Sequence, residues 1–180
     1  MANELSLLGA GLSGRVASPI GPNSPGTLAD DSSAGTIAWS NPTNAAASDD
    51  VYAASTCSSG ERSHYLNAQN FGFNVPNGAT ITDIKVEAEG NVSAALTTTL
   101  SAYIIKGGVV QSGAGVGAAT PDVTDTVMNM SPADALWLVS WTPADINASD
   151  FGCALYWTCP SRGATRTISI DHIKITVSFS

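Results

Sequence analysis

Residues 70–90 read NFGFNVPNGATITDIKVEAEG, and this stretch decides the fold class of the chain. A turn signal, Pro-Asn-Gly at 76–78, divides two runs in which apolar residues occupy every second position. The first run places them at Phe71, Phe73 and Val75, and the second at Ile84, Val86 and Ala88. This period predicts two strands of an antiparallel sheet, each with one face toward a core and one toward water. A one-residue slip of the second strand would bury the charges of Lys85, Glu87 and Glu89, so its register is fixed.

Short stretches of strand character, separated by turn residues, continue through residues 34–180. We predict further strands at 36–39, 50–54, 64–75, 96–104, 109–112, 151–158 and 165–179. Residues 121–130 are weakly patterned, and 135–141 (ALWLVSW) are apolar on both faces, as in a central or covered strand. Eight to ten short strands with regular turn signals are typical of a sandwich or barrel. We therefore predict an all-β protein with an antiparallel, jelly-roll-like β-sandwich.

Two local patterns refine this prediction. Thr142-Pro143-Ala144-Asp145 has the residues of a capping box with proline at the first helical position, which predicts a helix of one turn. In the last strand the apolar residues change parity between Ile170 and Ile173. This change predicts a β-bulge at Asp171-His172 or a change of register there, and it places the C-terminal strand inside a sheet.

Residues 1–33 differ in composition from the rest, and we predict an extended N-terminal arm there, followed by a sandwich domain at 34–180. The segment lacks lasting periodicity and cannot pack a core of its own. Its partner-binding candidates are apolar anchors near the start and prolines that stiffen the span behind them: Leu5, Leu7, Leu8, Leu12, Pro19, Pro22 and Pro25.

The composition limits the classes of partner that we expect for this chain. Only 12% of its residues are charged, about half the usual share, and the formal net charge is −8. Low charge suits close contact with other protein, and it equally suits a plain Ser/Thr-rich exterior. Without a cluster of Lys and Arg we expect no nucleic-acid partner. Without an apolar run of about 20 residues or a signal-peptide pattern, we expect no membrane partner and synthesis in a cytosol.

Few residues suggest chemistry. His64 and His172 lack partners at a catalytic or zinc-binding spacing, so we expect structural roles and no catalytic, metal or cofactor site. Loop carboxylates at Asp30-Asp31, Asp49-Asp50 and Asp122 with Asp125 could ligate calcium, although Asp is also a common turn and cap residue. Cys57, Cys153 and Cys159 have no metal-like spacing, and we expect three free thiols, at least one of them buried.

The tryptophans at 39, 137, 141 and 157, with Tyr156, suggest two interpretations. Exposed indole rings on a β-sandwich could stack on carbohydrate. Trp137 and Trp141 share a parity and would lie on one face of the predicted strand. Because Trp137 lies in a run that is apolar on both faces, burial is the stronger expectation.

An ordered series of phrases gives the chain a family likeness: WSNP at 39–42, ASDDVYA at 47–53, the stretch 70–90, WTPADINASDFG at 141–152 and IDHIKITV at 170–177. The series resembles a β-sandwich module of tailed-bacteriophage structural proteins and their prophage relatives, and it covers residues 34–180. The resemblance implies a virion component made in the host cytoplasm and transfers no catalytic residue.

A short single domain with an N-terminal arm is similar to capsid decoration (cement) proteins, which typically trimerise on the head surface. The leading hypothesis is therefore a non-enzymatic homotrimer on the capsid surface that binds and stabilises the major capsid protein lattice. The alternative is a tail- or fibre-associated module that binds host-surface glycan through tryptophans. A hydrolase with a site assembled from scattered residues is the third hypothesis.

Overall fold

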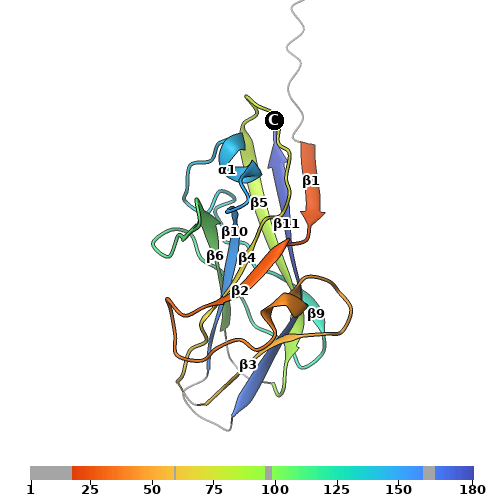
Figure 1. The fold of residues 1–180 in the computed structure, drawn as a ribbon, viewed down its shortest axis with the longest axis vertical. Helices are drawn as coiled ribbons and strands as arrows, with labels where there is room; N and C mark the ends of the chain where they lie inside the picture. Colours follow the sequence, from red (N-terminus) through yellow and green to blue (C-terminus); the bar gives the residue numbers. More distant parts are fainter. Residues whose placement is uncertain (1–17, 59, 96–98, 160–164) are drawn as a thin grey trace, which may run out of the picture.

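The computed structural model describes residues 18–58, 60–95, 99–159 and 165–180, and within them two antiparallel sheets pack face to face (Figure 1). The five-stranded sheet consists of β1 (Ser18–Asn23), β11 (Arg166–Phe179), β5 (Ile81–Val92) and β9 (Thr126–Asn129) in that order, with β3 (Ala53–Cys57) also paired to β11. The six-stranded sheet consists of β2 (Thr27–Asp31), β4 (Tyr65–Gln69), β10 (Gly152–Thr158), β6 (Thr99–Lys106) and β7 (Val109–Val110), with β8 (Gly117–Ala119) paired to β6.

The connectivity is that of a jelly roll. Leaving aside β1, β2 and the short β7, eight strands remain, and the five-stranded sheet orders them β3-β11-β5-β9. The six-stranded sheet orders the others β4-β10-β6-β8. Counted along the chain, these orders are first-eighth-third-sixth and second-seventh-fourth-fifth, which is the double Greek key of a jelly roll. The predicted all-β, jelly-roll-like sandwich is confirmed.

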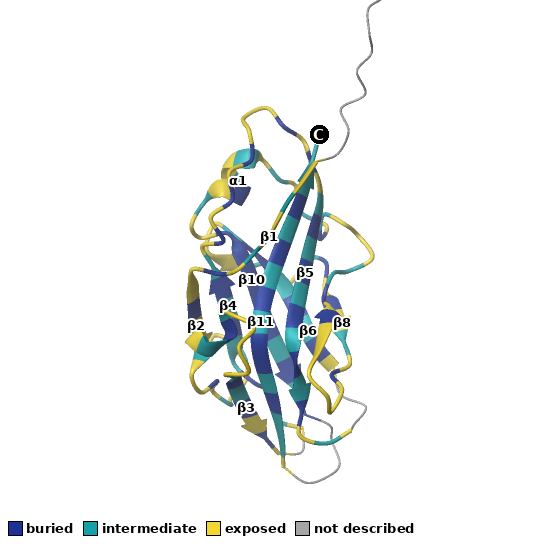
Figure 2. Cartoon of the chain, turned by 90° about the vertical axis from the view of Figure 1, so that its right-hand side faces the viewer, coloured by how far each residue is buried: buried dark blue, intermediate teal, exposed yellow. Residues whose placement is uncertain are grey.

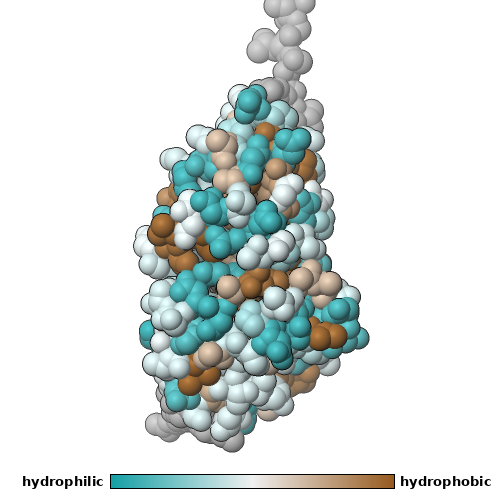
Figure 3. Space-filling view, viewed as in Figure 1, coloured by the Kyte–Doolittle hydropathy of each residue, from teal (hydrophilic) through white to brown (hydrophobic). Residues whose placement is uncertain are grey.

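The core lies between the sheets and follows the predicted alternation. On β5, Ile84, Val86 and Ala88 are fully buried, while the charged residues between them point outward. Figure 2 shows the same alternation along β11, where Ile173, Ile175 and Val177 are buried in full. Leu100 and Ala102 on β6 complete the set that we expected to share one core. Hydrophilic and neutral side chains dominate the face in Figure 3, with apolar side chains in small separate groups.

The predicted bulge is present. The pairing of β11 with β5 shifts between Ile170 and His172, so Asp171 is the extra residue. Gly90 lies opposite the start of the bulge, and a Cβ atom there would collide with the carbonyl oxygen of Ser169. The glycine therefore permits the close approach of backbones that the bulge requires. The one-turn helix α1 (Pro143–Asn147) has the predicted capping box of Thr142 and Asp145.

Residues 18–33 belong to the sandwich, which differs from the expected arm at 1–33. β1 pairs with β11, and β2 pairs with β4, so each sheet gains a strand from this segment. Both strands are short and mostly exposed, and their partners supply the hydrogen bonds that the segment could not supply for itself. The sandwich therefore begins at or before Ser18, and residues 1–17 lie outside the described part.

Residues 71–75 form no strand, contrary to the prediction. Phe71, Phe73 and Val75 are buried in alternation, but β4 ends at Gln69 and lies in the opposite sheet from β5. The segment is an extended crossover, and α1 satisfies its backbone: Asn147 Oδ1 accepts from the Val75 amide at 2.7 Å, and Nδ2 donates to the Val75 carbonyl at 2.9 Å. The burial of every second residue therefore indicates an extended backbone in this segment, although the segment is not paired with a strand.

Two other predicted strands are also wrong. Residues 36–39 contribute only an isolated bridge between Ile37 and Ser63. Residues 135–141 form successive turns, in which Trp137 and Leu138 have φ angles of 61° and 56°. Trp137 points into the core and Leu138 outward, so the apolar run reflects one buried anchor and not a covered strand. The 3₁₀ helix η1 (Pro42–Ala45) was not expected.

The expectation of three free thiols is wrong for two of them. A disulfide joins Cys57 on β3 to Cys159, the residue after β10, with Cα atoms 6.2 Å apart. The bond links the two sheets at the end of the sandwich opposite the C-terminus, across 102 residues of sequence that hid the pairing. Cys153 is a free, buried thiol, as expected for at least one cysteine. Neither helix in the described part of the chain is long and apolar enough to span a bilayer.

Candidate functional site

The structure separates the predicted partner-binding residues. Leu5, Leu7, Leu8 and Leu12 lie outside the described residues. Pro19 and Pro22 lie on β1, exposed at an edge of the five-stranded sheet. Pro25 is buried in the connection to β2, so it offers no surface to a partner. The prolines are therefore part of the sandwich and not of a free span.

The tryptophans are mostly core residues. Trp137 and Trp157 are fully buried and Trp39 is 3% exposed, which confirms the expected burial of Trp137. The indole N–H of Trp137 donates to the Ile84 carbonyl at 2.8 Å. Trp141 is half-buried, packed edge-on against Phe151 with a centroid distance of 5.4 Å. The indoles therefore provide no exposed stacking platform for a sugar.

Both histidines have local partners. Nδ1 of His64 lies 2.8 Å from an Asp30 carboxylate oxygen. Nε2 of His172 lies 2.8 Å from the Ser24 hydroxyl, which is the separation of a nucleophile and its base. However, His172 Nδ1 is buried and has no hydrogen-bond partner among the described residues, so none of them orients the base as in a hydrolase. Burial lowers the pKa of His172, and the charge of Lys174 lowers it further.

Three carboxylates from separate segments converge near the bulge. Asp50, Asp125 and Asp171 each place an oxygen within 4.8 Å of the others, and Asp171 is 2% exposed. The Tyr52 hydroxyl donates to Asp125 at 2.7 Å and lies 3.3 Å from an Asp50 oxygen, and the bond to Asp125 is the main cause that raises the pKa of Tyr52. Such oxygens are the ligands of a hard cation. Two of the three carboxylates also have hydrogen-bond donors within the protein: Asp125 accepts from the Tyr52 hydroxyl, and Asp171 accepts from the Asp49 amide at 3.3 Å.

Three tyrosines form a second cluster, here called the tyrosine patch: Tyr65 on β4, Tyr103 on β6 and Tyr156 on β10. Leu66, Ala102 and Leu155, their neighbours in sequence, are fully buried, so the tyrosines project from the outer face of the six-stranded sheet. The ring centroids are 5.8 Å apart for Tyr65 and Tyr103, 5.6 Å for Tyr65 and Tyr156, and 6.4 Å for Tyr103 and Tyr156. The three side chains are partly exposed and form one continuous aromatic surface.

A polar edge adjoins the patch. Asp31 pairs with Tyr65 in the register of β2 and β4, and its carboxylate accepts from the Ser33 amide and from Asn67 Nδ2, both at 2.9 Å. The amide of Ser33 is the main cause that holds the Asp31 pKa below its ordinary value of 3.8, so the group is ionised at neutral pH. The Asn67 Oδ1 atom is buried without a hydrogen-bond partner.

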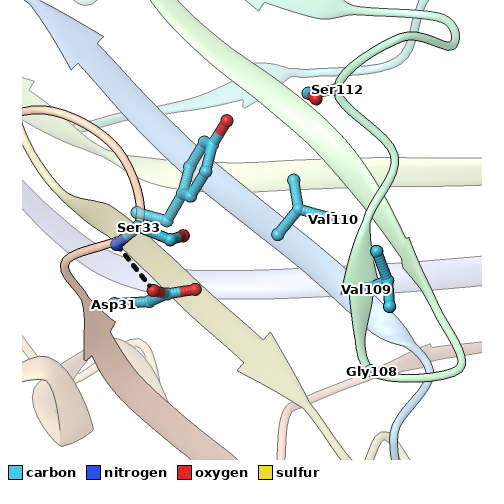
Figure 4. Close-up of a pocket in the computed structure, with 7 residues that line it drawn as sticks. Asp31, Ser33, Gly108, Val109, Val110 and Ser112 are labelled. Carbon is cyan, nitrogen blue, oxygen red and sulfur yellow. Dashed lines mark hydrogen bonds between the residues drawn. The ribbon is translucent and has the colours of Figure 1, made fainter.

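A surface pocket of about 350 Å³ continues from Tyr65. Asp31 and Ser33 form one side, and Gly108, Val109 and Val110 form the opposite side, as Figure 4 shows. Gly107 and Gly108 have φ angles of 57° and 73°, which a two-residue hairpin between β6 and β7 requires. Because the two walls come from opposite edges of the six-stranded sheet, this outer face is concave. The pocket combines aromatic, aliphatic and ionised groups, which suits binding more than bond breaking.

From the sequence we named Tyr156 as a candidate for sugar stacking but missed Tyr65 and Tyr103, for which the sequence also held a signal. Each tyrosine occupies a solvent-face position next to a core residue of its strand, and large aromatic side chains at such positions mark contact surfaces. The tyrosines are far apart in sequence, and only the register of β4, β10 and β6 brings them together.

Comparisons with known proteins add no identity. No family model matches the chain, and the search of curated proteins finds no match.

Proposed function

We propose that this protein is a structural component of a tailed-phage virion, a decoration protein that binds the major capsid lattice on the capsid surface. The observation that carries the proposal is that the first described residue and the C-terminus lie at the same end of the sandwich. Ser18, the first described residue, pairs with Phe179, next to the C-terminus (Figure 1). Residues 1–17, with their four leucines, therefore join the sandwich at one pole, where they can tether it to a particle.

The sequence of the edge strand β1 prevents the sheet from being extended by a strand of another chain. It pairs with β11 on one side only, and Pro19 and Pro22 lack the N–H groups that would bind another strand. Proline on an edge strand is a common device against unwanted sheet extension.

The disulfide between Cys57 and Cys159 supports a place outside the cell interior. Disulfides persist in oxidising surroundings, whereas a cytosol keeps thiols reduced. A particle protein made in a cytosol meets oxidising conditions once the host is lysed. The bond lies at the pole away from Ser18 and the C-terminus, so it stabilises the opposite end of the fold.

We also propose a homotrimer. β9 forms the other edge of the five-stranded sheet, and it exposes Val127 by 50%, with Val123 exposed by 48% in the preceding loop. Two neighbouring apolar residues on an open edge favour contact with protein. Closed symmetry covers such an edge without runaway association.

Particle attachment of a truncated chain tests the proposal. Because β1 starts at Ser18, deleting residues 1–17 removes no described strand, so the circular dichroism should not change. The truncated protein should sediment with capsids much less than the full chain does. A full-length variant with serine at Leu5, Leu7, Leu8 and Leu12 should behave like the deletion, and alanine at the polar positions Asn3, Ser6 and Ser13 should not weaken attachment. Undiminished attachment of the truncated protein would contradict the tether.

A further inference from the structure

We propose that the concave outer face of the six-stranded sheet binds a neutral saccharide. The rings of the tyrosine patch would stack on sugar rings, and Asp31 would accept hydrogen bonds from sugar hydroxyls. This inference goes beyond the proposed function, because it does not depend on where the protein sits on a virion.

The first support is the shape of the aromatic surface. A pyranose has an apolar C–H face and a hydroxyl edge, so it needs a flat apolar surface beside polar groups. The tyrosine rings contact one another at steep interplanar angles of 79°, 49° and 65°, so each ring is braced by its neighbours and a sugar would stack on the face of one ring at a time. Tyr65 belongs to both the patch and the pocket, so a bound oligosaccharide can extend from the pocket over Tyr103 and Tyr156.

The second support is the charge state of Asp31. Its carboxylate is fixed by the Ser33 amide and by Asn67, so it is ionised and oriented before any ligand arrives. Each of its oxygens has a further lone pair, and a hydrogen bond to an ionised acceptor is roughly twice as strong as one between neutral groups. Preorganised acceptors of this kind select hydroxyl donors.

The third support is the size and lining of the pocket. About 350 Å³ is at the small end of ligand pockets, which suits one or two sugar residues and not a folded partner. Val109 is 61% exposed at the tip of the β6–β7 hairpin and gives the wall opposite Asp31 an apolar surface. A sugar ring between these walls would place its C–H face against the valine and its hydroxyl edge toward the Asp31 carboxylate.

Other ligand classes fit less well. An anion would meet the Asp31 carboxylate on a chain of net charge −8. A cation can bind over the face of a single ring beside Asp31, and the hexalysine probe tests that ligand class directly. Arg62 already places a guanidinium 6.0 Å from the centroid of Tyr156. Its N–H groups can donate to a sugar hydroxyl at that end of the patch.

Tyrosine-selective NMR on the full chain tests the proposal. The protein has four tyrosines, three in the patch and Tyr52 at the acidic cluster, so ring labelling gives three reporters and an internal control. The probes are the neutral hexasaccharides of glucose (α- and β-linked), mannose and galactose, with hexalysine and sialyllactose as charged probes. We expect a neutral probe to shift the three patch signals and to leave Tyr52 unchanged.

Variants locate the site. Asp31→Asn keeps the side-chain shape and removes the charge, and it should weaken saccharide binding about tenfold or more. Tyr103→Ala should also weaken binding, whereas Tyr52→Phe should not, and circular dichroism checks that each variant is folded. The proposal is wrong if no neutral probe shifts the patch, if only a charged probe does, or if Tyr52 shifts equally. None of these results bears on particle attachment, so the decoration proposal is tested separately.

Discussion

Asn147 takes the place of a neighbouring strand for Val75. Its side-chain amide forms the two hydrogen bonds that a paired residue would form, accepting from the Val75 N–H at 2.7 Å and donating to the Val75 carbonyl at 2.9 Å. This contact lets the chain cross from the six-stranded sheet to the five-stranded sheet in an extended form while Phe71, Phe73 and Val75 remain in the core. The helix α1 therefore serves to hold the crossover.

Replacing Asn147 should destabilise the fold. In Asn147→Ala the part-buried N–H and C=O groups of Val75 lose their partners, which should lower the free energy of unfolding by about 1–3 kcal/mol. Urea denaturation followed by tryptophan fluorescence measures this loss. Asn74→Ala, at an exposed position of the same segment, is the matched control and should change stability little. Equal effects of the two substitutions would show that the contact contributes nothing specific.

Reduction of the disulfide should also destabilise the protein. Removing a bond that joins residues 102 apart costs on the order of 2–5 kcal/mol in unfolding free energy. Thermal unfolding with and without reductant measures the effect, and Cys57→Ser should reproduce it. A thiol count should give one reactive group in the denatured, unreduced chain and none in the native state, because burial raises the pKa of Cys153 to about 12. Three thiols in the unreduced chain would contradict the bond.

Stability should fall on acidification below pH 6.5 because of His172. Burial lowers the pKa of this ring in the folded state, and Lys174 adds to the effect, so the unfolded chain binds the proton more readily. Three carboxylates act in the opposite direction, those of Glu89, Asp171 and Asp49. The free energy of unfolding should therefore rise with pH through the range just below 6.5 and level off above it. His172→Gln should flatten this dependence, and an unchanged slope in that variant would assign it to other groups.

The exposed edge at β9 should mediate trimer formation. Val127→Glu places a charge on the apolar edge, so light scattering should show a change from three times the chain mass of 18.3 kDa toward a single chain. Val109→Glu, at a valine that is 61% exposed on the opposite sheet, should leave the trimer intact. A wild-type monomer in solution that also touches no copy of itself on particles would contradict the trimer.

The sequence predicted the elements whose pattern depends on local burial. The register of β5, the capping box of Thr142 and the bulge at Asp171 all follow from alternation or capping residues, and the structure confirms them. The errors arise where long-range contacts decide the outcome. Asn147 satisfies the backbone at Val75, and the Cys57–Cys159 bond joins segments 102 residues apart. The tyrosine patch belongs to the second class, because its members meet only through strand register.

The most direct test of the proposal that this chain is a phage decoration protein is an electron cryomicroscopy reconstruction of the particles produced from the genome that encodes it, at a resolution that traces the chain. We expect density for the jelly roll on the capsid surface, in three copies around a local three-fold axis. The pole that carries Ser18 and Phe179 should face the major capsid protein, with residues 1–17 in contact with that protein or with a neighbouring copy. Density for this chain on the tail, or its absence from the particle, would contradict the decoration proposal.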